Sequence, residues 1–320
     1  MIKYLTIPSI LLAALFSSCG KTTISKEPES QNIEQKVNLV ADKNDKIYKG
    51  DIELTTQKEI DDFGKNNYSF FDGNLSIGNT KSTEYNEEIF NLDALKSIKT
   101  INGDLMITKI NSLESVAGLS NLEKVNGSFD ISGCGTKLTK IENFEKLTTV
   151  NGDIIFGNNI GKYGKDGIRE INTFNNLKKV NNIYITGNSG LKALNAFNTL
   201  EEVKTIYISN TEIEVLSNFK NLKTINENFS IEFSDKLTSI IFPNLEVVKG
   251  HFALNEDSKI NGNIHLPKLK KLSNFYLASN ASFENYCDLA NHLKQNKIDT
   301  LTADFNKVDF TKEQVLEKCK

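Results

Sequence analysis

The sequence predicts a β-rich solenoid, in which short parallel strands stack coil upon coil and short helices close both ends. Three features indicate this class: a strand-and-turn signature that recurs nine times, a leucine-like signature in the arm before it, and a loss of the period at both ends of the repeat. The composition fits a folded chain with a sizeable core, because 38% of the 320 residues are hydrophobic and 25% are charged.

The N-terminus predicts an export signal. Lys3 precedes an apolar run that ends at Phe16, and two serines separate this run from Cys19. The run is too short to cross a bilayer as a mature helix, and Phe-Ser-Ser-Cys resembles a bacterial lipobox. We therefore expect residues 1–18 to be a signal peptide and Cys19 to carry a lipid. Ordinary secretion with a free cysteine is the alternative.

A phosphate-binding loop is the competing interpretation of Gly20-Lys21-Thr22. The pattern G-x-x-x-x-G-K-[ST] requires a second glycine where this chain has Leu15, and no strand-then-helix pattern surrounds the triplet. The lipobox is therefore favoured. The expected location is the cell envelope, as an outer-membrane lipoprotein whose periplasmic or surface orientation the sequence leaves open.

Residues 20–46 are polar and contain no aromatic side chain. Such a composition cannot bury enough apolar surface to fold. We expect residues 19–47 to form a tether that holds the following domain on the order of 30 Å from its lipid anchor.

Beyond the tether, one pattern recurs at steps of 22 to 30 residues: an apolar residue, a short turn rich in Asn and Gly, then two apolar residues separated by one. A single coil cannot bury its own apolar face and must stack on its neighbours, so this period indicates a solenoid. The nine copies are FDGNLSI (71–77), INGDLMI (101–107), VNGSFDI (125–131), VNGDIIF (150–156), VNNIYI (180–185), VKTIYI (203–208), INENFSI (225–231), VKGHFAL (248–254) and LSNFYL (272–277).

Several copies follow an arm with leucine-like residues three positions apart, which we expect to face the core. These sets are Leu113-Val116-Leu119-Leu122, Leu138-Ile141-Phe144-Leu147, Leu191-Leu194-Phe197-Leu200 and Ile213-Leu216-Phe219-Leu222.

The two ends depart from the period and predict caps. Residues 48–64 fit a short strand and then a helix, with Thr56 and Glu59 as a possible capping box. Residues 283–319 fit a helix, an extended segment and a second helix. The expected domains are a solenoid of about nine coils over 48–282 and a C-terminal helical cap over 283–320.

The coil signature I-N-G-D-L-x-I resembles that of the receptor L-domain family, which is related to leucine-rich-repeat proteins. The ends are similar to those of L-domain-like lipoproteins of Bacteroidota-type bacteria: GDIELTT (50–56) matches a G-D-[IV]-x-L-x-[ST] opening, and YCDL (286–289) with Cys319 matches a Y-C-x-L cysteine and a second cysteine near the terminus. The resemblance covers about residues 48–319 and implies a right-handed parallel β-helix of the leucine-rich-repeat type. Turns shorter than the family's occur at Val180, Val203 and Leu272.

The cysteines of an exported chain can pair. Cys287 and Cys319 both lie in the closing segment, so we expect a disulfide that joins the two helices of the cap. Cys134 is left over and is expected to be a small residue at a coil bend rather than a reactive thiol.

Little in the sequence points to catalysis, a metal or nucleic acid. His251, His265 and His292 have no ligand-like spacing, and no G-x-S-x-G elbow occurs, so we expect no catalytic residues, no metal and no cofactor. The formal net charge of −3 and the single arginine, Arg169, are atypical of a nucleic-acid-binding protein.

Strand alternation suggests a binding surface. The residue between the two inward apolar positions of each copy must point out of the sheet, and Ile155, Tyr184 and Tyr207 are consecutive in that column, with Tyr276 further along. Thr186, Ser209 and Thr205 are expected to flank them. The alternative is that these side chains only stabilise the sheet through cross-strand pairs. Inserted loops at about 78–91 and 157–167 are a second candidate region.

The predicted function is a non-catalytic, lipid-anchored binding or adhesion module of the cell envelope that recognises a protein or a glycan. The alternative is a scaffold subunit of an envelope assembly that binds a partner protein constitutively. A glycan-active β-helix enzyme is disfavoured, because the coils are short and leucine-spaced and no acid–base cluster stands out.

Overall fold

The structure, a computed structural model, describes residues 39–160, 167–257, 259–280, 287–304, 306 and 310–319. The chain divides into two compact units, Met1–Lys36 and Val37–Lys320. The first unit lies outside the described residues, and with it lie the predicted signal peptide, Cys19 and most of the predicted tether. The solenoid lies in the second unit.

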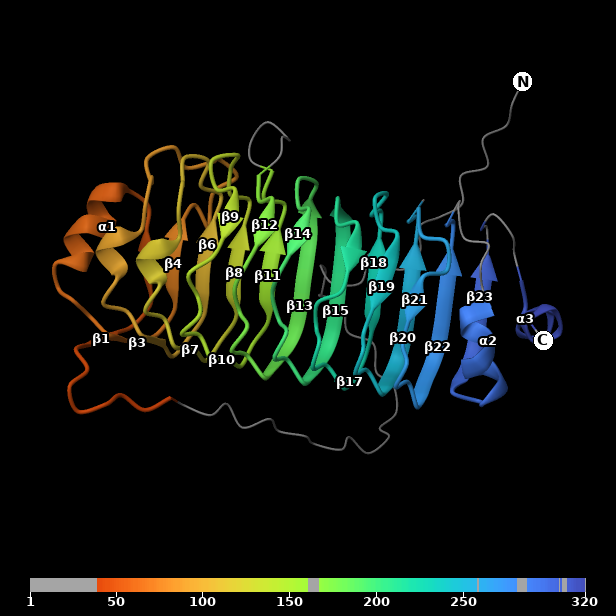
Figure 1. The fold of residues 1–320 in the computed structure, drawn as a ribbon. Helices are drawn as coiled ribbons and strands as arrows, with labels where there is room; N and C mark the ends of the chain where they lie inside the picture. Colours follow the sequence, from red (N-terminus) through yellow and green to blue (C-terminus); the bar gives the residue numbers. More distant parts are fainter. Residues whose placement is uncertain are drawn as a thin grey trace, which may run out of the picture. The chain divides into compact units, whose positions relative to one another are not determined.

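Parallel strands form the main wall of the solenoid, a twelve-stranded sheet (Figure 1). Its strands follow the order of the sequence, with one coil supplying both β17 and β18. They are β2 (Ile52–Leu54), β4 (Leu75–Gly78), β6 (Leu105–Thr108), β8 (Phe129–Ser132), β11 (Ile154–Gly157), β13 (Lys179–Asn188), β15 (Glu202–Thr211), β17 (Thr224–Ile225), β18 (Phe229–Glu232), β20 (Val247–Asn255), β22 (Lys271–Ala278) and β23 (Ile298–Asp304).

Three smaller parallel sheets complete the coils. One has five strands: β1 (Ile47–Lys49), β3 (Phe70–Asp72), β5 (Thr100–Ile101), β7 (Lys124–Val125) and β10 (Thr149–Val150). Two have three strands each: β9 (Lys140–Ile141), β12 (Glu170–Ile171) and β14 (Ala193–Leu194), then β16 (Val215–Leu216), β19 (Ser239–Ile241) and β21 (Ile264–His265). The predicted β-rich parallel solenoid is confirmed, and β2 and β23 add one rung at each end to the nine that the signature marks.

The Asn-Gly turns exist because successive coils approach closely there. A Cβ atom on Gly127 would lie 2.7 Å from the carbonyl oxygen of Gly103, and one on Gly152 would lie 2.7 Å from that of Gly127. The polar residue after the glycine then bonds the next coil: the carboxylate of Asp104 accepts from the backbone N–H of Ser128 at 2.7 Å, and the Ser128 hydroxyl accepts from that of Asp153 at 3.2 Å. The recurring N-G-D motif is therefore a contact between coils as well as a turn.

The coils with shortened turns use longer strands instead. β13 and β15 each run for 10 residues through the position of the turn and pair in register, with Val180 opposite Val203 and Ile183 opposite Ile206. Within each of these strands the two inward positions, such as Val180 and Ile183, are three residues apart, whereas in an N-G-D coil they are four apart. The shorter spacing lets the strand continue without a turn. β20 keeps the extra residue and shows a register shift between Val248 and His251.

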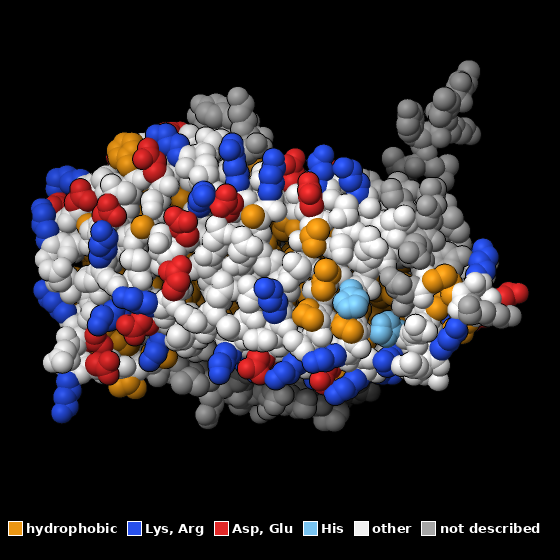
Figure 2. All heavy atoms as spheres, in the orientation of Figure 1, with side chains coloured by type: hydrophobic (Ala, Val, Ile, Leu, Met, Phe, Trp, Pro, Cys, Tyr) orange, Lys and Arg blue, Asp and Glu red, His pale blue; other side chains and the backbone are white. Residues whose placement is uncertain are grey.

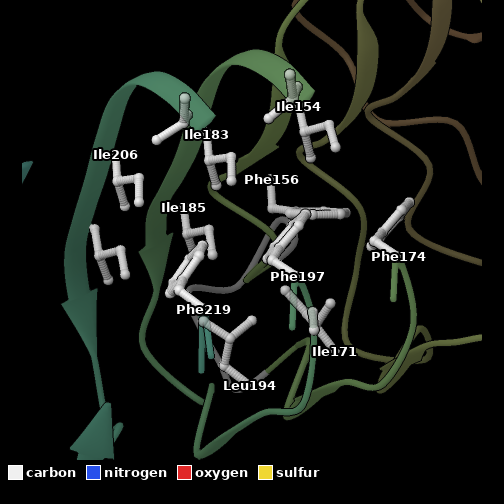
Figure 3. Packing of buried hydrophobic residues seen from close by; sticks show 14 of the residues in the cluster. Ile154, Phe156, Ile171, Phe174, Ile183, Ile185, Leu194, Phe197, Ile206 and Phe219 are labelled. Carbon is white, nitrogen blue, oxygen red and sulfur yellow. The ribbon is translucent and has the colours of Figure 1, made fainter. Parts of the chain in front are cut away.

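The core is a single stack of aliphatic and phenylalanine side chains, and every residue of the four predicted leucine-like sets is buried in it. Phe174, Phe197 and Phe219 follow one another along the stack (Figure 3), with ring centroids 5.5 and 5.6 Å apart and planes within 8° of parallel. All three have left-handed backbone, with φ of 64°, 62° and 59°. Bulky residues rarely adopt this conformation, so ring packing must offset its cost.

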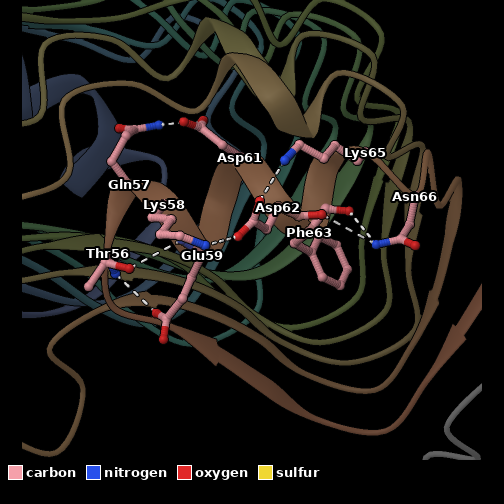
Figure 4. A network of polar contacts seen from close by, with 9 residues as sticks. All are labelled: Thr56, Gln57, Lys58, Glu59, Asp61, Asp62, Phe63, Lys65 and Asn66. Carbon is pink, nitrogen blue, oxygen red and sulfur yellow. Dashed lines mark hydrogen bonds and ion pairs between the residues drawn. The ribbon is translucent and has the colours of Figure 1, made fainter.

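A helix covers the first coil. α1 (Gln57–Gly64) begins with the predicted capping box, in which the Thr56 hydroxyl accepts from the backbone N–H of Glu59 and the Glu59 carboxylate accepts from that of Thr56 (Figure 4). Ile60 is fully buried against the core. The helix therefore shields the open end of the apolar stack.

The other end carries α2 (Cys287–Lys294) and α3 (Lys312–Lys318), on either side of β23. Leu289 and Val315 bury their side chains in the core, one from each helix. Cys287 and Cys319 form the predicted disulfide, with their Cα atoms 5.3 Å apart. The predicted order of helix, extended segment and helix is found here, and the extended segment is the last strand of the main sheet.

A polar ladder runs inside the solenoid beside the core. In several coils a buried asparagine amide donates to a backbone carbonyl of the preceding coil: Asn188 donates to Phe156 at 2.8 Å and Asn280 to Leu254 at 2.9 Å. Asp257 takes this position in one coil and is completely buried. Its Oδ1 accepts from the backbone N–H of Ser234 at 2.9 Å, but Oδ2 has no partner among the described residues.

Burial raises the pKa of Asp257 to about 7, and the neighbouring acids Glu232 and Asp235 add to the effect. A protonated carboxyl can donate as an asparagine amide does, whereas an ionised one cannot. At a pH between these two values, the Asp257 carboxyl is protonated in the folded state, whereas in the unfolded chain, with a pKa near 3.8, it is ionised.

Phe197→Ala should lower the free energy of unfolding by about 3–5 kcal/mol, because it removes a buried ring from the stack and leaves a cavity. Urea denaturation followed by circular dichroism measures the loss. Phe233→Ala is the matched control, because Phe233 has the same left-handed backbone with φ of 53° but is 51% exposed. Equal losses from the two substitutions would contradict this account of the stack.

Asp257→Asn should remove a fall in stability that the unsubstituted protein shows as the pH rises from about 4 to about 7. The folded pKa is the higher one, so the stabilisation is complete below the unfolded pKa and is lost through this window, on the order of 2–4 kcal/mol. Urea denaturation at several pH values measures it. Asn280→Asp, at the same position one coil on, should introduce a similar fall; parallel pH profiles for all three proteins would refute the assignment.

Candidate binding face

The outer face of the main sheet carries the predicted column in register. Ile155 lies opposite Tyr184 in the β11–β13 pair, and Tyr184 lies opposite Tyr207 in the β13–β15 pair. Neighbouring strands are about 4.8 Å apart, so the three side chains form a continuous stripe. We call Ile155, Tyr184 and Tyr207 the tyrosine stripe.

Tyr276 lies in the same column but apart from the stripe. Tyr207 pairs with Ser230, Ser230 with Ala253, and Ala253 with Tyr276. The short side chains of Ser230 and Ala253 separate the two tyrosines. The structure thus brings three of the four predicted ligand-binding residues together and leaves Tyr276 three rungs away.

Small polar residues border the stripe, as the strand alternation predicted. Thr186 pairs with Ser209 on one side of it, and Asn182 pairs with Thr205 on the other. All three members of the stripe are half-buried by these neighbours. A half-buried row of large side chains on a fixed ladder gives a rigid, partly apolar surface.

Glu232 lies beside Tyr207. The Tyr207 hydroxyl donates a 2.9 Å hydrogen bond to Oε2 of Glu232, and Oε1 accepts from the Ser230 hydroxyl and the Asn255 amide, each at 3.2 Å. Burial, and then the charge of Glu232, raise the pKa of Tyr207 to about 12. Tyr207 is therefore a neutral hydrogen-bond donor at physiological pH.

Two further carboxylates lie near Tyr184. Its pKa is raised by burial first, and then by the charges of Asp153 and Glu227. Asp153 accepts from the Asn182 amide at 2.8 Å, and Glu227 accepts from the Thr205 hydroxyl at 3.2 Å. These carboxylates hold Tyr184 in its neutral form as well.

The acidic character continues toward the N-terminal coils. Asp130, one rung before Ile155, has a pKa raised by burial and by the charge of Asp104, while a hydrogen bond from the Ser132 hydroxyl opposes the rise. The prediction of the stripe did not include the carboxylates beside it. The same alternation could have placed Asp153 and Glu232 on this face, because each lies two residues along the chain from a position of the column: Asp153 from Ile155, and Glu232 from Ser230.

Ion pairs occur at several other places on the solenoid. Lys and Arg side chains line the margins of the face in Figure 2, with acidic side chains among them. Examples are the pairs Lys223–Glu201 at 3.1 Å and Lys270–Glu246 at 2.7 Å, each between adjacent coils. Such exposed pairs contribute little to stability.

The first predicted rim loop, 78–91, is anchored to the body of the protein. Asn86 is buried, donates to the backbone carbonyl of Thr55 and forms an isolated bridge with Ile110. The second loop, 157–167, lies partly outside the described residues.

A groove of about 740 Å³ lies where the two three-stranded sheets fail to join, between β14 and β16. Lys192 and Glu212 form an ion pair of 3.3 Å in its lining. Val215, also in the lining, is an apolar side chain that is 46% exposed. Its lining combines lysines, glutamates and asparagines, which favours no single class of ligand.

Within the described part of the chain, no group of three or more His, Cys, Asp or Glu side chains is arranged to hold a metal ion. Cys134 is fully buried, and burial raises the pKa of its thiol to about 12, which keeps it unreactive. No helix of the described residues is both long and apolar enough to span a membrane.

Residues 99–163 match the family model described as Receptor L domain. This segment begins at β5, extends past β11 and contains the coils with the N-G-D turn. Comparisons with curated proteins and with solved structures found no match. The chain is thus similar to receptor L domains over these coils, and the architecture of the whole solenoid is L-domain-like.

Proposed function

We propose that the protein is a lipid-anchored binding module of the cell envelope, without catalytic activity, that holds a partner protein on the tyrosine stripe. The observation that carries the proposal is the in-register row of Ile155, Tyr184 and Tyr207, large and half-buried side chains on the outer face of a rigid sheet. Tyrosine is enriched in binding surfaces because it offers a large, stiff contact area and a polar tip.

The similarity to receptor L domains supports a binding role, because solenoids present extended surfaces to partners. A role in sheet stability alone accounts less well for the stripe. Cross-strand pairing needs no run of large, partly exposed side chains, and Ser230 and Ala253 fill the next two rungs of the same column. A glycan is the alternative ligand, and a constitutive scaffold role is the alternative to reversible adhesion.

The double variant Tyr184→Ala/Tyr207→Ala should capture at least about ten-fold less of its partner from solubilised envelope than the unsubstituted protein, because two central aromatic anchors are removed. Quantitative mass spectrometry of the captured proteins measures this, beside a glycan array. Val215→Ser is the control, because it removes an exposed apolar side chain from another sheet. Unchanged capture by the double variant would refute the stripe as the binding surface.

Cys19→Ala should abolish membrane attachment if Cys19 is the lipidated residue, because the anchor would no longer form. Detergent-phase partition and incorporation of a labelled fatty acid measure attachment. Cys134→Ala should leave both unchanged. Fatty-acid labelling that persists in Cys19→Ala would overturn the lipobox assignment, and protease treatment of intact cells reports which side of the membrane the solenoid faces.

A further inference from the structure

We propose that the tyrosine stripe is selective for cationic side chains, so that the partner is a protein segment that presents lysine or arginine to this face. The inference rests on the proposed function and specifies the chemistry of its ligand. It is carried by the carboxylate of Glu232 beside Tyr207 and by those of Asp153 and Glu227, which are bonded to Asn182 and Thr205 next to the stripe.

The negative charge of Glu232 is not compensated by its hydrogen bonds. Its donors are the hydroxyls of Tyr207 and Ser230 and the amide of Asn255, and all three groups are neutral. These bonds orient the carboxylate, fix it beside the Tyr207 ring and leave its charge in place.

The carboxylates near Tyr184 are held in the same way. Asp153 accepts from an asparagine amide and Glu227 from a threonine hydroxyl. Lys204, next to Thr205 in β15, already has an interaction partner. Among the described residues, none of the ion pairs involves Asp153, Glu227 or Glu232, whereas Glu201, Glu202 and Glu246 are each paired with a lysine.

The rings add a second source of attraction for a cation. Both tyrosines are neutral phenols, so each ring presents the negative face of its quadrupole to an ammonium or guanidinium group. Ile155, at the end of the stripe, can cover the aliphatic part of a lysine or arginine side chain. Carboxylate, ring and aliphatic surface together match a long cationic side chain better than a sugar hydroxyl or an anion.

The length of the acidic track favours an extended segment over a single cation. From Asp130 to Ser230 the column covers four steps of about 4.8 Å, or roughly 19 Å. About six residues of extended chain span that distance. Asp104 and Asp130 continue the negative potential beyond the stripe, so successive cationic residues would each find a carboxylate.

Synthetic peptides of about eight residues, alternating serine with lysine, arginine, glutamine or glutamate, test the proposal by fluorescence anisotropy with the full-length protein. The lysine and arginine peptides should bind, and their affinity should fall about ten-fold as the salt concentration rises from about 0.05 to about 0.3 M. Equal binding of the glutamine and lysine peptides, or no binding of any peptide, would overturn it.

Variants separate the contributions of charge and ring. Glu232→Gln and Asp153→Asn should each weaken lysine-peptide binding about three- to ten-fold, and Tyr207→Ala about five-fold or more, whereas Tyr207→Phe retains the ring and most of the affinity. Glu142→Gln is the matched charge control, because Glu142 is exposed and follows β9 on another sheet. Melting temperatures confirm that each variant is folded; a loss with Glu142→Gln equal to that with Glu232→Gln would refute a local site.

Partner capture distinguishes failure of this inference from failure of the proposed function. If both the Tyr184→Ala/Tyr207→Ala and the Glu232→Gln/Asp153→Asn variants lose the partner, cation recognition stands. Loss with the tyrosine variant alone rejects cation recognition and keeps the binding face. Capture that neither variant changes rejects both.

Discussion

The backbone contact between successive coils is the constraint on which the rest of the structure depends. Every coil must return to the same register so that its strands bond the coil before it, and the chain achieves this over twelve strands of one sheet. Where two coils approach most closely, only glycine fits. The register of the strands then fixes where each side chain lies: inward-facing residues stack as one core, and outward-facing residues stack as columns.

The candidate binding face is a direct product of this register. Tyr184 and Tyr207 are separated along the chain by a whole coil, yet they lie side by side because their strands pair residue for residue. The carboxylates beside them are fixed by bonds between coils, such as those of Asp153 with Asn182 and of Glu227 with Thr205. A rigid surface of this kind loses little entropy on binding, which is the advantage of a solenoid as a recognition scaffold.

Much of the fold could be predicted because every coil must pair in register with its neighbours, and this requirement repeats the same residue pattern along the sequence. The signature marked nine rungs of the main sheet, the leucine-like arms marked core positions, and the capping box at Thr56 marked the first helix. The column through Ile155, Tyr184 and Tyr207 followed from alternation alone, since a period of two leaves one choice of face.

The rest depended on contacts between coils that have no local signal. Alternation alone places Glu232 on the outer face, but its hydrogen bond to Tyr207, 25 residues away in the chain, requires the exact register of β15 with β18. The shortened turns made that register ambiguous, because a chain with one residue fewer could have kept the turn or straightened into a longer strand. Asp257 gave no signal either, since its burial follows from an inner ladder that contains asparagine in other coils.

The central claim is that the stripe of Ile155, Tyr184 and Tyr207, with its carboxylates, is the surface that meets the partner. Nuclear magnetic resonance of the protein labelled at its tyrosine rings tests this most directly, with Tyr48 and Tyr68 in the aromatic cluster near α1 as internal references. Addition of the captured partner should shift and broaden the signals of Tyr184 and Tyr207 and leave those of Tyr48 and Tyr68 in place. Changes at Tyr48 and Tyr68, with Tyr184 and Tyr207 unaltered, would contradict the account.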